Sequence, residues 1–234
     1  VIETLSQQIP IGRDVFTKGR IKSDNFILSA KILKDYSKVM SEYGVSSFRA
    51  IATSAVREAV NRDIFIDRML QETGINVEAL DSSEEIRLVY LSIKNLIGNR
   101  FAKGSDALIA MVGTGSSHMC LVRNGMLKRA ESFRMGTIRI YEELGQPIGG
   151  SGGLIDDVVD SIVDLLLKSF SGIPGSLIAV GAAPRSLLDI AEKNGAAVSD
   201  TLSLDDFFKV AKIVSSTTPD KIAGKYGIPD MAAA

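Results

Sequence analysis

Apolar residues recur in the first hundred positions with the spacing of helices that bury one face. Three stretches follow this pattern, and each begins at a serine or an aspartate and ends before a glycine. The predicted helices run from 23 to about 43, from 63 to 73 and from 82 to 97. Apolar runs at 47–52 and 75–80 separate them and have the length of strands. Helix and strand therefore alternate, which predicts an α/β sheet with helices packed on it.

The second half of the chain opens with a predicted hairpin. Six apolar residues at 107–112 predict a buried strand, and 119–122 predict a returning strand. Further strands are expected at 126–133 and 176–180, and helices at 137–144, at 154–170 and from Arg185, with a glycine-rich linker at 145–153. The polar stretch at 99–106 is the best candidate for a boundary between two domains. We therefore expect one α/β domain over 1–103 and a second over 104–234.

The turn of this hairpin has the composition of a phosphate cradle. It consists of Gly113, Thr114, Gly115, Ser116 and Ser117. Glycines let the backbone approach a ligand closely, successive amides can form an anion nest, and the hydroxyls add donors. The turn matches neither the P-loop nor the dinucleotide fingerprint. Glycine-rich turns between strands are common, so a purely structural turn is the alternative.

Composition limits the partners of the chain. The net charge is −1, which gives no electrostatic footprint for nucleic acid or an anionic membrane surface. No apolar run reaches the length of a membrane span and no signal peptide is visible, so we expect a cytoplasmic protein. The single cysteine, Cys120, lies in an apolar strand, which predicts a buried and inert thiol. The ends at Val1 and Ala234 lead us to expect that the native protein is longer.

Polar side chains follow several of the predicted strands. One segment covers 53–59, a second covers 81–85, and the hairpin turn is the third; Gly181 follows the last strand as a weaker fourth. Open α/β sheets place their sites at the carboxyl ends of the strands. These segments are therefore expected to lie at one site.

Two of these segments carry a family resemblance. Residues 52–61 and 72–90 resemble the exopolyphosphatase and guanosine pentaphosphate phosphohydrolase (Ppx/GppA) family, and 12–21 and 134–139 match its pattern in order. The resemblance implies an actin-like ATPase fold, with two ribonuclease-H-like α/β domains around a cleft. It implies hydrolysis of terminal phosphoanhydrides, with polyphosphate or guanosine penta- or tetraphosphate as partners. A homodimer is a candidate assembly.

The resemblance also assigns roles to residues. It makes Glu85 the general base, Arg57 a phosphate contact and the hairpin turn a phosphate loop, with Gly181 in the last glycine turn. Local sequence leaves alternatives open for the first two. Glu85 could close a capping box by reaching back to the Ser82 amide. Arg57 could be a solvated helix arginine paired with Glu58.

In the family that this chain resembles, the hairpin carries two acidic residues that help to place a divalent metal. This chain has a different residue at each of these two positions. The positions are Met111 and His118. A thioether and an imidazole are poor substitutes for the oxygen ligands that magnesium prefers. The alternative for Met111 is a place in the hydrophobic core, and the alternative for His118 is a structural role as a hydrogen-bonding residue. Magnesium is therefore a weakly supported cofactor, and the metal ligands stay unknown.

Two functions follow for this chain. The first is a phosphoanhydride hydrolase that binds phosphate at the turn and Arg57 and activates water with Glu85. The second is a catalytically degenerate relative that binds polyphosphate or a guanine nucleotide as a sensor or scaffold. Loss of the hairpin acids favours the second function, whereas retention of Glu85 and Arg57 favours the first.

Overall fold

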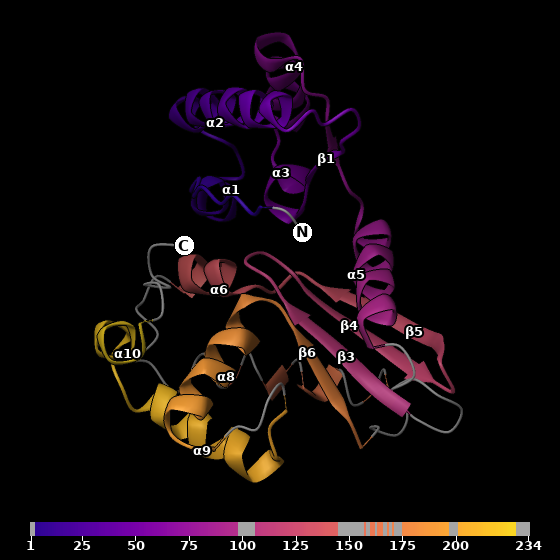
Figure 1. Ribbon diagram of the computed structural model, residues 1–234, viewed down its shortest axis with the longest axis vertical. Helices are drawn as coiled ribbons and strands as arrows, with labels where there is room; N and C mark the ends of the chain where they lie inside the picture. The colour runs from indigo at the N-terminus through magenta and orange to yellow at the C-terminus, as the bar shows by residue number, and fades with distance from the viewer. Residues whose placement is uncertain are drawn as a thin grey trace.

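The computed structural model describes residues 3–97, 106–144, 175–196 and 201–227, with isolated positions between 157 and 170. The elements form an N-terminal group, a four-stranded sheet and a set of C-terminal helices (Figure 1). Most of the predicted boundary at 99–106, the linker at 145–153 and most of the helix at 154–170 lie outside the described residues. The division at 103 and 104 therefore stays a prediction.

The N-terminal group packs helices on a pair of parallel strands. Its elements are α1 (Ile11–Lys18), α2 (Ser23–Glu42), β1 (Ala50–Ala52), α3 (Ser54–Glu58), α4 (Arg62–Thr73) and β2 (Val77–Ala79). The rings of Phe26 and Phe65 meet edge to face at 5.1 Å in its core, beside the fully buried Met69. The pattern predicted the positions of α2 and α4 within two residues. The short helices α1 and α3 were not predicted.

The second group is the sheet, in the order β5-β4-β3-β6. Its strands are β3 (Asp106–Val112), β4 (Ser117–Arg123), β5 (Met126–Phe133) and β6 (Leu177–Val180). The first three strands are antiparallel neighbours, and β6 runs parallel to β3. The helix α5 (Ser82–Ile97) lies on one face of this sheet (Figure 1), where Ile86 and Ile93 pack against Ile109 and Val122. The predicted hairpin and third strand are confirmed.

Cys120 belongs to this buried face. Its side chain is fully buried, and burial raises the pKa of the thiol to about 11. A thiol with that pKa carries almost no thiolate at neutral pH, so it is a poor nucleophile. The prediction of a buried, inert cysteine is confirmed.

The remaining helices of the described ranges follow β5 and β6. They are α6 (Thr137–Leu144), α8 (Ala182–Lys193), α9 (Leu204–Ser215) and α10 (Pro219–Tyr226). The last three share a core of Ile190, Ala191, Val210 and Tyr226. The helix expected from Arg185 begins three residues earlier, at Ala182, which places Pro184 in its first turn. A first-turn amide has no acceptor within the helix, so proline loses no hydrogen bond there. None of the helices in the described ranges is long and apolar enough to cross a bilayer.

Candidate functional site

The polar segments predicted to converge come from both sheets. The helix α3 follows β1 directly, α5 starts just after β2, and the hairpin tip joins β3 to β4. In Figure 1 the hairpin tip and α6 lie below α1 and α3, and α1 contacts both α3 and α6. The site therefore forms where the N-terminal group meets the four-stranded sheet.

Glu85 is the central charged group of this site. It is 8% exposed and bonded on both carboxylate oxygens: Arg57 Nη1 donates to Oε2 at 2.8 Å, and His118 Nε2 lies 3.2 Å from Oε1. Burial opposes ionisation of the carboxyl, but the hydrogen bonds from His118 and Arg57 outweigh it and lower the pKa of Glu85. Glu85 is therefore a carboxylate at neutral pH.

These contacts settle the two local alternatives. The cap of α5 is Asp81, whose Oδ1 accepts the Glu84 amide at 2.8 Å, so the capping role for Glu85 is wrong. Arg57 is not a solvated arginine paired with Glu58. Its side chain is 17% exposed, and the same Nη1 also donates to the carbonyl of Leu80 at 2.8 Å.

His118 joins the hairpin to this ion pair. The ring is 1% exposed, and Nε2 also lies 3.2 Å from the hydroxyl of Ser116. A carboxylate beside Nε2 requires a proton on that nitrogen, while Nδ1 is buried without a partner among the described residues. The geometry therefore makes His118 a hydrogen-bond donor to Glu85 through Nε2.

The carbonyl groups of the hairpin turn point at the start of α6. The carbonyl of Gly113 accepts from the Thr137 amide at 3.0 Å, and the carbonyl of Thr114 accepts from the amides of Ile138 and Arg139, both at 3.0 Å. The carbonyl of Gly115 accepts from Arg139 Nε at 2.8 Å. In a planar trans peptide the N–H points opposite to the C=O. The amides of Thr114, Gly115 and Ser116 therefore point away from α6, and none has an acceptor in the described part of the chain. Three such amides can form an anion nest.

Close packing fixes this turn. A Cβ on Gly136 would lie 2.3 Å from the backbone nitrogen of Gly115, and a Cβ on Gly115 would lie 2.3 Å from the Phe16 ring and 2.4 Å from the Ser54 hydroxyl. Both positions therefore need glycine for close approach. Thr114 is the exposed residue of the tip, which leaves the turn open to solvent there.

An ion-pair cluster that local sequence reasoning missed ties α3 to α6. Glu58 accepts from Arg139 Nη2 at 2.7 Å and from Arg134 Nη2 at 2.6 Å. Arg139 is 5% exposed, and its guanidinium stacks 4.3 Å from the centre of the Phe16 ring. The match of 134–139 to the family pattern was the one signal for these arginines, and it gave no partner.

Gly181 lies at the same end of the sheet but outside the ion-pair network. It follows β6, whose Val180 is paired with Met111 of β3, and its φ of +124° is one that favours glycine. A Cβ there would lie 3.7 Å from the Val112 carbonyl oxygen. The glycine is therefore next to the hairpin turn, as the strand pattern predicted.

The two positions at which the resemblance predicts metal-placing acids face each other across the strands. Met111 is directly opposite His118 in the register of β3 and β4, and it is half-buried rather than core. No group of three or more His, Cys, Asp or Glu side chains within the described ranges could hold a metal ion. A thioether and an imidazole already bonded to Glu85 do not fit magnesium, which binds oxygen ligands.

Comparison with known sequences gives the family of the chain. The sequence profile of the Ppx/GppA phosphatase family matches residues 1–146. A bifunctional 3-dehydroquinate synthase/phosphatase of Fusobacterium nucleatum is 27% identical over 138 residues, which are 58% of this chain and 20% of the relative. Exopolyphosphatase 2 of Mycobacterium tuberculosis is 24% identical over 139 residues, 57% of this chain and 42% of the relative. The chain thus spans less than half the length of these curated relatives.

Comparison with solved structures bears on the fold. The structure of an exopolyphosphatase from Cytophaga hutchinsonii has a TM-score of 0.81 to this chain at 21% identity. The match covers 99% of this chain and 78% of that one. The predicted fold class, an α/β protein of the actin-like ATPase type, is confirmed.

Proposed function

The chain belongs to the Ppx/GppA phosphatase family, and from this premise we propose that its site hydrolyses the terminal phosphoanhydride of polyphosphate or of guanosine pentaphosphate. The observation that carries the proposal is the ionised and buried Glu85, held between Arg57 and the hairpin that carries the free amides of the turn. A general base and an anion nest on neighbouring segments are what attack of water on a bound phosphate needs.

The chain supplies two groups for holding the phosphate. The amides of Thr114, Gly115 and Ser116 can bond the oxygens of a terminal phosphate, and Arg57 can bind them as a fork. Arg57 now donates to Glu85, so a phosphate at the turn competes with Glu85 for this guanidinium. Binding of the substrate then frees one oxygen of Glu85.

The freed oxygen gives Glu85 its proposed role. It accepts a proton from a water molecule as the water oxygen bonds to the terminal phosphorus and the bridging P–O bond breaks. The products are inorganic phosphate and a chain shortened by one phosphate. His118 keeps its bond to the other oxygen and orients the carboxylate.

A binding protein without turnover is the second candidate. The observation that favours it is the Met111 and His118 pair, which places no carboxylate on the hairpin at the family's two acid positions. Such a protein would keep the anion nest and bind polyphosphate or a guanine nucleotide as a sensor or scaffold.

The two candidates differ in phosphate release. We expect release from polyphosphate or guanosine pentaphosphate by the purified chain, and a loss of about 10²- to 10⁴-fold in kcat for Glu85→Gln, as is typical of general-base removal. Glutamine also breaks the ion pair with Arg57, so this variant is expected to lose some stability.

The neighbouring Glu84→Gln is the matched control. Glu84 lies on the same turn of α5 and pairs with Arg87 at the surface, so its variant should keep the kcat of the unsubstituted chain. Equal kcat values for the two variants would show that Glu85 takes no part in the reaction. No release from either substrate, together with binding of polyphosphate, would favour the sensor.

A further inference from the structure

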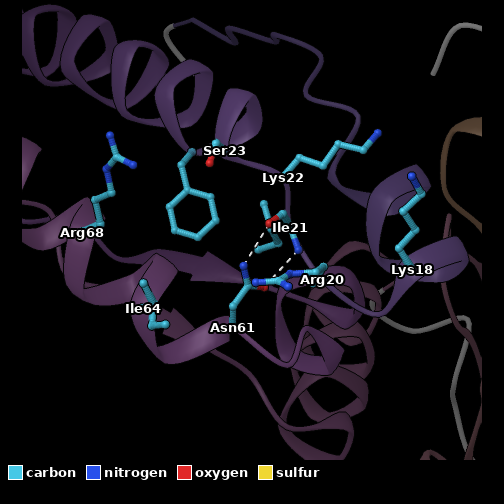
Figure 2. A pocket seen from close by; sticks show the side chains of 9 residues that line it. Lys18, Arg20, Ile21, Lys22, Ser23, Asn61, Ile64 and Arg68 are labelled. Carbon is cyan, nitrogen blue, oxygen red and sulfur yellow. Dashed lines mark hydrogen bonds between the residues drawn. The ribbon is translucent and has the colours of Figure 1, made fainter.

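A second region of the molecule combines a cavity with unneutralised positive charge. The cavity, about 440 Å³, lies between the segment that joins α1 to α2 and the start of α4. Four of its nine lining residues are cationic, namely Lys18, Arg20, Lys22 and Arg68, and none is acidic. In Figure 2 Lys18, Arg20 and Lys22 lie on one side, with Ile64 and Arg68 on the other. None of these residues belongs to the site around Glu85.

Two of the four cations have their own counterions. Lys22 Nζ lies 2.7 Å from Asp14, and Arg68 Nε lies 2.6 Å from Glu72. Lys18 and Arg20 are exposed, and among the described residues neither has a carboxylate within ion-pair distance. The lining therefore keeps an excess of two positive charges.

The segment that carries these cations is fixed in place. The Asn61 side chain accepts from the Ile21 amide and donates to the Ile21 carbonyl, both at 2.9 Å, and the Val60 amide donates to Gly19 at 2.9 Å. The buried Asp14 accepts the Lys22 amide at 3.1 Å. Lys18 and Arg20 therefore extend from a rigid support, which reduces the entropy lost when they bind a ligand.

The chemistry of the lining indicates the ligand. Two cations separated by one residue match an anion that carries charge on more than one linked phosphate group. The volume lies in the range of cavities that hold small organic ligands, and Ile64 adds an apolar wall that is 65% exposed. We propose that this cavity is a second anion site, which binds linked phosphates of a nucleotide or of inorganic polyphosphate. It does not depend on hydrolysis at Glu85.

A fluorescent reporter can test the cavity directly, because the chain has no tryptophan. Ile64→Trp places one in the wall. We titrate this variant separately with tripolyphosphate, ATP and adenosine. Tripolyphosphate, ATP or both should change the emission of the tryptophan, and adenosine should not. A response to both phosphates indicates recognition of the linked phosphates alone, whereas a response to ATP alone identifies a nucleotide site.

Removal of the two free cations gives the decisive comparison. In the Ile64→Trp background, K18A/R20A should weaken the observed binding about tenfold or more, as expected for lost hydrogen bonds to charged groups. K31A/K38A is the matched control, since both lysines lie on α2 outside the cavity and their removal changes the net charge equally. Equal affinity in the two variants, or no emission change with either phosphate, would overturn the proposal. Phosphate release measured on the same proteins reports separately on Glu85.

Discussion

At the residue scale, the most informative position is 118. The family resemblance predicts an acid at this position, and the structure turns the histidine that stands there toward Glu85, with 3.2 Å between Nε2 and the carboxylate. An acid there would face Glu85 with like charge unless a cation lay between them. His118 removes that need, because its N–H stabilises the ionised Glu85 without a metal. The substitution at 118 therefore matches the chemistry of the site around it.

Restoring both hairpin acids should create a dependence on magnesium. Met111→Asp with His118→Glu places two carboxylates opposite each other and beside Glu85, so the double variant should unfold at lower temperature in chelator. Magnesium at about a hundredfold excess over its Kd should restore about 2.7 kcal/mol. The measurement is thermal unfolding with and without magnesium.

An exposed pair on β5 provides the control for this experiment. Met126→Asp with Ala130→Glu adds the same two acids where both side chains are exposed, so magnesium should leave its melting temperature unchanged. A magnesium response of the original chain as large as that of the double variant would contradict the interpretation of Met111 and His118.

At the element scale, the hairpin turn and the start of α6 act as one unit. The turn gives its carbonyls to the first amides of α6, and this fixes the direction of its own amides. Gly136 sits between them, and the contacts it would make with a side chain are with backbone atoms, which cannot move aside. The anion nest therefore depends on α6 as much as on its own glycines.

A single methyl group at 136 should disturb this unit. Gly136→Ala would force the turn and α6 apart, and overpacking of this kind destabilises proteins by about 1–3 kcal/mol. Sulfate should raise the melting temperature of the original chain above that in chloride of equal ionic strength, and the variant should lose this gain. Gly175→Ala is the control, because its Cβ would meet nothing within 4 Å. Equal urea midpoints and equal sulfate gains for the two variants would refute the coupling.

At the scale of the whole molecule, Glu58 joins the N-terminal group to the sheet. It is bonded to Arg139 at the start of α6 and to Arg134 after β5, so a single side chain bridges both parts of the site. The neighbouring Arg57 holds Glu85 from the same short helix. The position of α3 therefore sets the distance between the base and the turn.

Neutralising this bridge should destabilise the fold more than neutralising a surface pair. Glu58→Gln leaves the buried Arg139 with only its longer contact to Glu143 at 3.6 Å, which should cost up to about 3 kcal/mol. Glu78→Gln breaks the exposed pair with Arg49 and should cost about 1 kcal/mol or less. Urea unfolding of both variants gives the comparison. A midpoint for Glu58→Gln as high as that for Glu78→Gln would show that the bridge contributes little.

The sequence by itself determined the elements whose signal is local. The period of apolar residues located α2, α4, α5 and the hairpin, because burial of one face requires that spacing. Motifs after the strands indicated Arg57, Glu85 and the turn as neighbours, and the resemblance in the same segments gave the family.

The tertiary structure decided which atoms meet. Local sequence was compatible with a capping role for Glu85, and only the packing of α5 against β4 turned its carboxylate toward His118 while Asp81 took the cap. Arg139, Glu58 and the cavity beside Lys18 depend on residues up to 81 positions apart. Contacts between distant segments leave no periodic signal in one sequence, because each partner alone looks like an ordinary charged surface residue.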